Sequence, residues 1–406
     1  MPIHPGVLRG TRTFPVGGRP GVMDSFSSKR IWVIAGEHSG DAYGAGIVQA
    51  IRRRDSRTSF FGLGGPRMAG AGIELVRDMT RISVTGFIEV LRHLSEYRRL
   101  LSELDTRLAR GEADIIVLVD YPGFNLRLAR LAAKRGIPVV YFVSPQIWAW
   151  GRRRIGMIRR TVKRMLVLFD FEEKLYQEHG ISVRWVGHPL LDIIPEPVGV
   201  VDDDGVTIAL FPGSRPSEIA HHAAILLDAA RRIRAEAPAS IFRMVGADDA
   251  CTRLLQRHVA EAGLGACVRL ETGNAHEVMR ESTLAVAASG TLTLEAALLG
   301  LPAVVIYRGS WISYGIARCL VRVSHISLPN ILAGREIYPE LIQGAVTPRR
   351  VAEEALALLR DPGRRRRIRG ELAEIRRHLG VPGAFERAAD EVVAVLSETL
   401  KGRGGC

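Results

Sequence analysis

Short apolar runs alternate with longer amphipathic stretches along most of the chain. Apolar runs of strand length occur in the first half at 30–36, 114–120, 137–145, 164–169 and 183–189. The segments between them, such as "RLARLAAKRG", carry apolar residues at helical spacing and can end at a glycine. Buried strands that alternate with helices predict a parallel sheet covered by helices on both faces.

The alternation pauses at 191–205 and then restarts. This stretch includes "DIIPEPVGVVDDDG", whose prolines, glycines and acidic cluster are typical of an interdomain connection. Further strands are predicted at 206–214, 240–247, 266–271, 283–289 and 302–307. We therefore predict an α/β protein with two doubly wound parallel-sheet domains, divided into 29–190, a linker at 191–205, 206–380, and a C-terminal helix and tail at 381–406.

Composition narrows the class of partner. The 406-residue chain has 56 lysines and arginines against 43 acidic residues, a net charge of +13. Such an excess favours nucleic acid, phosphorylated ligands or an acidic membrane surface as partners. The four cysteines show no CxxC and no zinc-like spacing, which favours a reduced cytoplasmic protein. Residues 1–28 lack the apolar core of a signal peptide and are predicted to be a disordered leader, with Met1 or Met23 as the start.

Several common signatures are missing from the sequence. The nearly uncharged run 282–307 is interrupted by Gly290, Gly300 and Pro302, so a membrane span is not predicted. No GxxxxGK[ST] or GxSxG occurs, and "GLGGPRMAG" has Arg67 where the third glycine of GxGxxG belongs. P-loop ATPases, serine hydrolases and ordinary dinucleotide dehydrogenases are therefore disfavoured.

The segment "AASGTLTLE" in the second half has the features of an anion site. A buried strand turns into a helix at Ser289, Gly290 and Thr291, where hydroxyl groups can cap the helix and the glycine admits a ligand. The first-turn N–H groups and the helix dipole favour a phosphate. Glu295, the single charge in a long apolar stretch, either faces water or accepts hydrogen bonds from a ribose diol. A capping box from Thr291 is excluded because Leu294 occupies the required position.

A second anion-competent turn lies in "LFPGSRPSEI". A strand enters a turn that contains Gly213, Ser214 and Arg215, and an arginine there can grip a pyrophosphate with two hydrogen bonds. The alternative is a surface turn with an incidental arginine. Two such loops at strand ends of the same half predict a nucleotide diphosphate site.

The first half carries polar residues at two of its strand ends. "AGEHSGD" follows the first strand and bears Glu37, His38, Ser39 and Asp41. "VDYPGFN" places Asp120 at the end of another buried strand, where a carboxylate can act as a general base toward a hydroxyl nucleophile. The alternative for Asp120 is a side chain that caps a turn ahead of Pro122.

Together these motifs resemble a known family. "AGEHSGD", "FGLGGPRM", "VDYPGFN", "VSPQIWAW", "VGHPLLD", "LFPGSRPSEI", "ASGTLTLE" and "SLPNILAGRE" follow the order seen in the lipid-A-disaccharide synthases, glycosyltransferase family 19, from about Arg30 to about Glu340. The resemblance implies a GT-B fold, in which two Rossmann-like domains face each other across a cleft.

The resemblance also implies a reaction. A UDP-2,3-diacylglucosamine donor and 2,3-diacylglucosamine 1-phosphate (lipid X) would give the β-1,6-linked lipid A disaccharide 1-phosphate and UDP, with inversion. Asp120 would then be the base, and Glu295 would hold the ribose. The groups that would stabilise the departing UDP, in place of a metal or other cofactor, are Arg215, the Gly213–Ser214 turn and the helix start at Ser289, Gly290 and Thr291.

The same resemblance places further residues along the cleft. They are Glu37, Ser39, Asp41, Trp148 and Asn330. The family usually has a small or uncharged residue where His38 stands, so His38 either competes with Asp120 as base or lines the site.

Lipid substrates imply peripheral contact with the cytoplasmic face of the inner membrane. Helical spacing of apolar residues at 86–101 predicts either a core-facing helix or an acyl groove. The segment 152–164 has seven basic residues in thirteen, next to Trp148 and Trp150, and could attract anionic headgroups or the acceptor's phosphate. A solvated helix is the alternative. Nucleic acid is not predicted, because no RNA-binding motif accompanies this segment.

Two other function classes stay open from sequence. One is a different UDP-sugar enzyme of this architecture, such as a UDP-N-acetylglucosamine 2-epimerase or a peptidoglycan glycosyltransferase. The other is a basic, non-enzymatic module that binds nucleic acid or membrane. The oligomeric state is not predicted.

Overall fold

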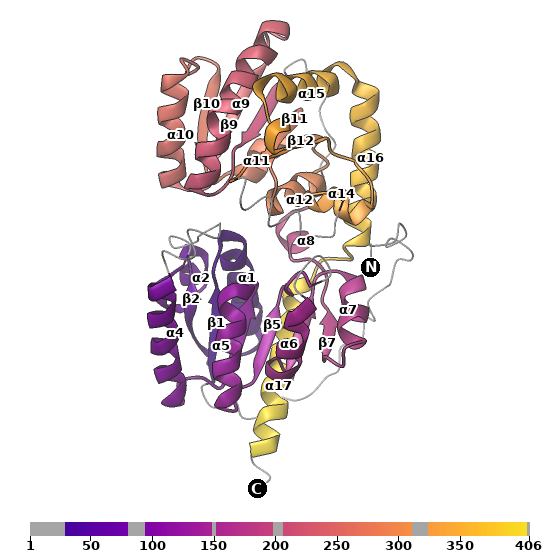
Figure 1. Ribbon diagram of the computed structural model, residues 1–406. Coiled ribbons are helices and arrows are strands. Elements are labelled where there is room, and N and C mark those ends of the chain that lie inside the picture. Colours follow the sequence, from indigo (N-terminus) through magenta and orange to yellow (C-terminus); the bar gives the residue numbers. More distant parts are fainter. Residues whose placement is uncertain (1–28, 80–93, 148–151, 198–205, 311–323, 404–406) are drawn as a thin grey trace. The chain divides into compact units, whose positions relative to one another are not determined.

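The computed structural model describes residues 29–79, 94–147, 152–197, 206–310 and 324–403. These residues form two compact units (Figure 1). The N-terminal unit contains the described residues up to Asp192 and again from Leu379 onward, and the C-terminal unit contains Ile193–His378. The boundary between the two units after Asp192 lies inside the segment 191–205 that was predicted to be a linker. The predicted leader, 1–28, lies outside the described residues.

The described part of the N-terminal unit contains a seven-stranded parallel sheet of order β3-β2-β1-β4-β5-β6-β7. Its strands are β1 (Arg30–Ala35), β2 (Ser59–Gly64), β3 (Glu74–Asp78), β4 (Ile115–Val119), β5 (Val139–Phe142), β6 (Arg164–Val167) and β7 (Val183–Trp185). Its helices are α1 (His38–Arg54), α2 (Pro66–Gly70), α4 (Leu94–Ala109), α5 (Pro122–Lys134), the 3₁₀ turn η1 (Arg152–Arg154), α6 (Ile155–Thr161), α7 (Asp170–Gln177), α8 (Leu190–Ile193, which reaches the division) and α17 (Ala384–Arg403).

The described part of the C-terminal unit contains a six-stranded parallel sheet of order β10-β9-β8-β11-β12-β13. Its strands are β8 (Thr207–Phe211), β9 (Ile241–Gly246), β10 (Val268–Thr272), β11 (Leu284–Ala288), β12 (Ala303–Tyr307) and β13 (Glu340–Ile342). Its helices are α9 (Pro216–Glu236), α10 (Asp249–Glu261), α11 (Ala275–Arg280), α12 (Thr291–Leu298), α14 (Leu328–Ala333), the 3₁₀ turn η2 (Gln343–Ala345), α15 (Pro348–Arg360) and α16 (Pro362–His378).

The central strands are buried along their whole length, as expected of sheets covered by helices on both faces. Every residue of β4 ("IIVLV") and of β11 ("LAVAA") is buried. The predicted fold class, two doubly wound parallel α/β sheets, is confirmed. Strands β2, β3 and β13 were not predicted from the sequence, because β2 contains two glycines, β3 is a polar edge strand and β13 has three residues.

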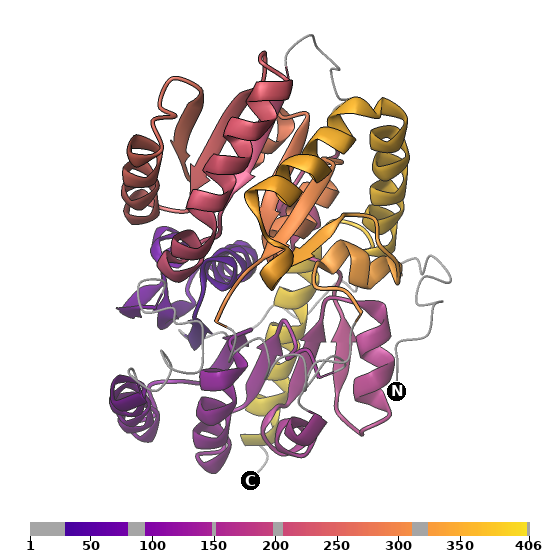
Figure 2. The same ribbon diagram turned by 45° about the horizontal axis from the view of Figure 1, so that its top comes forward.

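The last helix, α17, packs on the N-terminal unit (Figure 2). The carboxylate of Asp192 accepts hydrogen bonds from the backbone N–H groups of Gly383 and, at 2.9 Å, Phe385. The Phe385 ring lies so close to Gly46 on α1 that a Cβ there would come within 2.5 Å of it. Glu386 forms ion pairs with Arg53 and Arg54 at the end of α1. Helix α17 therefore completes the packing of the N-terminal unit.

The basic segment 152–164 is partly neutralised by α17. Arg164 pairs with Glu391 at 2.8 Å and with Glu398 at 3.3 Å, and Lys163 lies 3.9 Å from Glu398. Burial lowers the pKa of Arg154. The side chains of Arg153, Arg159 and Arg160 remain exposed.

The apolar segment 86–101 is described only from residue 94 onward, so Phe87, Val90 and Leu91 lie outside the described residues. In its described part, Leu100 is buried in the core of the N-terminal unit, and Tyr97 and Leu101 pack against that core. This part of the segment is a core-facing helix. Among the described helices, none has the length and apolar character needed to cross a membrane.

Candidate active site

The polar loops of the N-terminal unit leave the sheet side by side. Strands β1 and β4 are parallel neighbours, and Ala35 pairs with Val119 at their carboxyl ends. The loop at 36–37, which leads into α1, and the turn at 120–121 follow directly. Strand order reverses between β1 and β4, and ligands of doubly wound sheets bind at such a switch point.

Asp120 and Tyr121 both adopt the left-handed conformation, with φ of 48° and 49°. Sparsely populated backbone conformations of this kind cost on the order of 1–3 kcal/mol each and gather at functional sites. The Asp120 N–H donates to the carbonyl of Phe142 at 2.9 Å. The Asp120 carbonyl accepts from Asn125 Nδ2 at 2.7 Å and from the Tyr141 hydroxyl at 2.6 Å.

The Tyr121 side chain ties this turn to the start of α1. A Cβ at Gly36 would lie 2.4 Å from two atoms of the Tyr121 ring, so only glycine fits there. The Tyr121 hydroxyl donates to that of Tyr97 at 2.6 Å. Burial first, and then the Tyr97 hydrogen bond, raise the pKa of Tyr121; the charge of Glu37 adds to this effect. Glu37 and the two hydroxyls therefore lie near one another.

Three of the four candidates in "AGEHSGD" lie at the start of α1. Glu37 is the N-cap residue, with no capping hydrogen bond from its side chain, and His38 and Ser39 form the first turn. All three are half-buried. Asp41 was predicted to line the cleft, and the structure corrects this, because Asp41 is only 2% exposed. Its carboxylate instead accepts from the N–H groups that open α2, those of Gly65 (2.7 Å), Arg67 (3.0 Å) and Met68 (3.0 Å).

Two other lining candidates change status. Trp148 lies outside the described residues. Asn330 is 0% exposed, so it does not line a surface. Its Oδ1 accepts from the N–H groups of Ile337 (2.8 Å) and Tyr338 (2.9 Å), and its Nδ2 donates to the Tyr338 carbonyl and to Glu340 Oε1, both at 2.8 Å. Asn330 thus organises the loop between α14 and β13.

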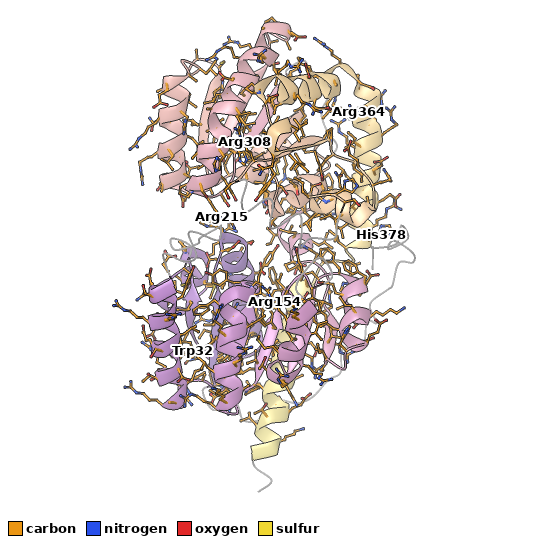
Figure 3. All side chains as sticks on the ribbon, in the orientation of Figure 1. Trp32, Arg154, Arg215, Arg308, Arg364 and His378 are labelled. Atoms are coloured by element: carbon orange, nitrogen blue, oxygen red, sulfur yellow. The ribbon has the colours of Figure 1, made fainter. Side chains whose placement is uncertain are left out.

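The C-terminal unit repeats the switch-point arrangement. Strands β8 and β11 are parallel neighbours, and Phe211 pairs with Ala287 near their carboxyl ends. The loop that contains Gly213, Ser214 and Arg215 and the turn at Ser289–Thr291 therefore start from adjacent strands. Gly213 has φ of +123°, a conformation that favours glycine. Arg215, labelled in Figure 3, is the N-cap residue of α9.

Glu218 holds this loop, although it was not predicted to be a site residue. Its Oε2 accepts from the Ser214 N–H at 2.9 Å, and its Oε1 lies 2.7 Å from Arg215 Nη1. A Cβ at Gly213 would meet the same carboxylate at 2.4 Å. Ser214 belongs to the turn that the resemblance assigned to the departing UDP, and its N–H is thus already bonded within the loop. Pro216 followed by Glu218 in the first turn was the signal that could have revealed it.

His222 links this loop to the end of β12. It is 1% exposed, its Nδ1 lies 2.7 Å from the Pro212 carbonyl, and the Arg308 N–H donates to its Nε2 at 3.0 Å. Because a carbonyl only accepts, Nδ1 carries the proton and the ring is neutral. Burial lowers the pKa of His222, which agrees with this state.

The turn into α12 is built differently from the prediction. The Ser289 hydroxyl donates to the Ile326 carbonyl at 2.9 Å, and Gly290 is the N-cap residue, with no side-chain cap. The predicted hydroxyl cap is therefore wrong. Thr291 opens the helix and is half-buried. Gly290 has no side chain, so the N-cap residue of α12 does not cover the first N–H groups of the helix. An anion site at a helix start requires this arrangement.

Glu295 has a neighbour that the sequence did not reveal. Its Oε2 lies 2.8 Å from Nε2 of His276, in the first turn of α11. The two side chains are 20% and 30% exposed, so both reach solvent. Helix α11 follows the carboxyl end of β10, at the edge of the sheet where the other candidate residues of the C-terminal unit also lie. Across the described ranges, no cluster of three or more His, Cys, Asp or Glu side chains could hold a metal ion.

Solved structures of other proteins share this fold. A UDP-N-acetylglucosamine 2-epimerase from Neisseria meningitidis bound to UDP-GlcNAc covers 91% of this chain and 100% of its own, with a TM-score of 0.60 at 11% identity. A calicheamicin glycosyltransferase covers 92% of this chain and 99% of its own, with a TM-score of 0.57 at 17% identity. These likenesses confirm the predicted fold, two parallel-sheet α/β domains of the kind found in GT-B glycosyltransferases.

Sequence comparison identifies closer relatives. The lipid-A-disaccharide synthase of Syntrophus aciditrophicus is 40% identical over 388 residues, which is 94% of this chain and 100% of the relative. That of Myxococcus xanthus is 40% identical over 380 residues, 90% of this chain and 97% of the relative. The profile of the lipid-A-disaccharide synthetase family matches residues 31–388. The chain belongs to the lipid-A-disaccharide synthase family.

Proposed function

We propose that this protein makes the lipid A disaccharide for which its family is named, by joining two acylated glucosamines. It transfers 2,3-diacylglucosamine from its UDP donor to the 6-hydroxyl of 2,3-diacylglucosamine 1-phosphate, and the products are the β-1,6-linked disaccharide 1-phosphate and UDP. The observation that carries this proposal is the family match over residues 31–388, with the family motifs at the switch points of both sheets.

The test is an incubation of the protein with both lipid substrates. Disaccharide 1-phosphate and UDP are expected in equal amounts, with no turnover of UDP-N-acetylglucosamine. Turnover of UDP-N-acetylglucosamine without disaccharide would instead indicate a 2-epimerase. Steeply salt-dependent binding of RNA or DNA without UDP release from any sugar donor would indicate a basic binding module.

On the acceptor side, Asp120 is the general base. The acceptor oxygen attacks the anomeric carbon of the donor, the bond from that carbon to UDP breaks, and the proton of the attacking hydroxyl passes to Asp120. Support comes from the strained turn at the carboxyl end of β4, which holds this carboxylate at a switch point. Glu37, His38 and Ser39 line the same corner.

On the donor side, the N-terminus of α12 and Arg215 stabilise the charge that develops on the departing UDP. Gly213 and Ser214 act through the shape of their loop, since Glu218 uses the Ser214 N–H. Glu295 accepts from the ribose hydroxyls. Its support is its place one turn into the helix that follows the anion site.

The lipid substrates require access to a membrane, so the protein works peripherally at the cytoplasmic face of the inner membrane. The exposed Arg153, Arg159 and Arg160 supply attraction to anionic headgroups. Replacement of all three by glutamine should weaken co-sedimentation with anionic vesicles but not with zwitterionic ones. The matched control replaces the exposed Arg231, Arg232 and Arg234 of α9; an equal loss there would refute a specific membrane surface.

A further inference from the structure

We infer that Tyr141 and Asn125 are positioning residues that hold the catalytic carboxylate of Asp120 in its working direction. The inference rests on the proposed role of Asp120 as the base. The two side chains are buried and act on the reaction only indirectly, through their hydrogen bonds to the backbone of Asp120.

The backbone at this corner is strained over more than one residue. Asp120 and Tyr121 are consecutive non-glycine residues with positive φ, and Val143, at the end of the neighbouring β5, has φ of 64°. A positive φ in a β-branched residue such as valine is a rare outlier. Strain of this kind persists only when the surrounding structure fixes it from several sides. Its place at the carboxyl ends of β4 and β5 is the edge where such sheets bind ligands.

Two side chains from different elements fix the Asp120 carbonyl. Tyr141 lies on β5 and Asn125 on α5, and both are 0% exposed. Both donate to the same oxygen, at 2.6 and 2.7 Å. The Asp120 N–H still continues the ladder to Phe142 at 2.9 Å. The peptide on one side of Asp120 thus belongs to the sheet, and the peptide on the other side is turned out of it.

The hydrogen bonds of the Asn125 amide further support this role. Its Nδ2 also lies 3.2 Å from the Val119 carbonyl and 3.4 Å from the Ile34 carbonyl. Its buried Oδ1 finds no hydrogen-bond partner in the described part of the chain. A buried amide that leaves its acceptor unused is unfavourable in itself. The role of Asn125 is therefore that of a hydrogen-bond donor. Its amide group donates to carbonyls at the ends of β1 and β4, and its shortest bond is to the Asp120 carbonyl.

The opposite side of the turn is held by Tyr121, whose ring fills the space over Gly36 and whose hydroxyl bonds to Tyr97. The left-handed pair is thus fixed at the carbonyl of its first residue and at the side chain of its second. A general base must lie within hydrogen-bond reach of the hydroxyl it deprotonates. Small displacements of a reacting group cost large factors in rate. Loss of this support should therefore lower kcat and leave substrate binding intact.

The test compares two buried tyrosines. Tyr141→Phe removes one hydroxyl and nothing else. Tyr338→Phe is the matched control, because Tyr338 is also 0% exposed and its hydroxyl donates to a backbone carbonyl, that of Leu301, at 2.7 Å in the C-terminal unit. Both variants should lower the midpoint of thermal unfolding. Only Tyr141→Phe should lower kcat, by about five- to tenfold, with KM for both substrates unchanged within about twofold.

The double variant with Asp120→Asn shows whether the effect passes through the base. If Tyr141 acts only through Asp120, then Asp120→Asn with Tyr141→Phe should be no slower than Asp120→Asn alone. The inference is overturned if Tyr141→Phe keeps the wild-type kcat, if it raises KM instead, or if the two losses multiply. Failure of the wild-type protein to form disaccharide would reject the proposed function itself, so the two failures are distinguishable.

Discussion

The Nε2 atom of His276 lies 2.8 Å from Oε2 of Glu295, joining the first turn of α11 to α12. A carboxylate only accepts hydrogen bonds, so the imidazole donates and fixes the orientation of the carboxyl group. In the proposed donor site, the second oxygen, Oε1, would accept from a ribose hydroxyl. On this proposal His276 supports the donor site, although no motif identified it.

Glu295→Ala should weaken UDP binding by about 1–2 kcal/mol, because a charged acceptor of a ribose hydroxyl is lost. It should also reduce the preference for UDP over 2′-deoxy-UDP or 3′-deoxy-UDP. Calorimetric titration measures both effects. Glu277→Ala is the control, since Glu277 is an exposed carboxylate on α11. Equal losses in the two variants would show only a change in overall charge.

His276→Gln should retain most of the UDP affinity, because the glutamine amide can donate to Glu295, whereas His276→Leu should lose part of it. We expect a loss of about 0.5–1.5 kcal/mol for the leucine variant, as for one hydrogen bond. The same titration with the deoxy nucleotides locates the loss. An equal loss for UDP and for both deoxy nucleotides would show that His276 does not act through the ribose contact.

Asp120→Asn should lower kcat by on the order of 10²-fold or more and leave UDP binding nearly unchanged, because general-base catalysis contributes about that factor. Asp105→Asn is a suitable control, as Asp105 forms a surface pair with Arg135 at 2.8 Å. His38→Ala tests the alternative base. If His38→Ala abolishes turnover while Asp120→Asn remains active, the roles of the two residues are reversed.

Arg215→Ala should weaken UDP binding by about 1–3 kcal/mol, since a charge-assisted contact to the diphosphate is lost. Arg231→Ala is matched to it, because Arg231 lies on α9, the helix that begins after Arg215, and also pairs with an acidic residue three positions away, Asp228. Uridine, which lacks the phosphates, should bind both variants as it binds the wild type. Unchanged affinity of Arg215→Ala for UDP would remove this residue from the site.

Acid should destabilise the N-terminal unit through His188. This ring is 3% exposed, and burial lowers its pKa from 6.5 to about 3. The unfolded chain therefore binds a proton between about pH 6.5 and pH 3 that the folded chain does not. The contribution to stability is complete above pH 6.5 and falls by about 1 kcal/mol per pH unit below it. The pH dependence of the unfolding midpoint should become shallower in His188→Gln; an unchanged slope would assign the acid sensitivity elsewhere.

The sequence predicted the strands that read as unbroken apolar runs, and it placed the candidate residues at strand ends. It could not separate residues that face a ligand from those that support the backbone. Asp41 lies in the same motif as Glu37, and Asn330 lies in "SLPNILAGRE", yet both are buried, because the fold brings them to partners at Gly65 and Tyr338. Glu218 was within reach of a pattern argument. His222 was not, because it meets Arg308 at a separation of 86 residues.

The docking of α17 has a consequence for biosynthesis. The described residues of the C-terminal unit come from one continuous stretch, 193–378, which is synthesised before α17. The N-terminal unit cannot complete its packing at that stage, because the surface of α1 around Gly46, Arg53 and Arg54 is covered by the 20-residue helix α17. Its assembly therefore finishes only after α17 has been synthesised, and a nascent chain stalled before residue 384 would leave that surface of α1 uncovered.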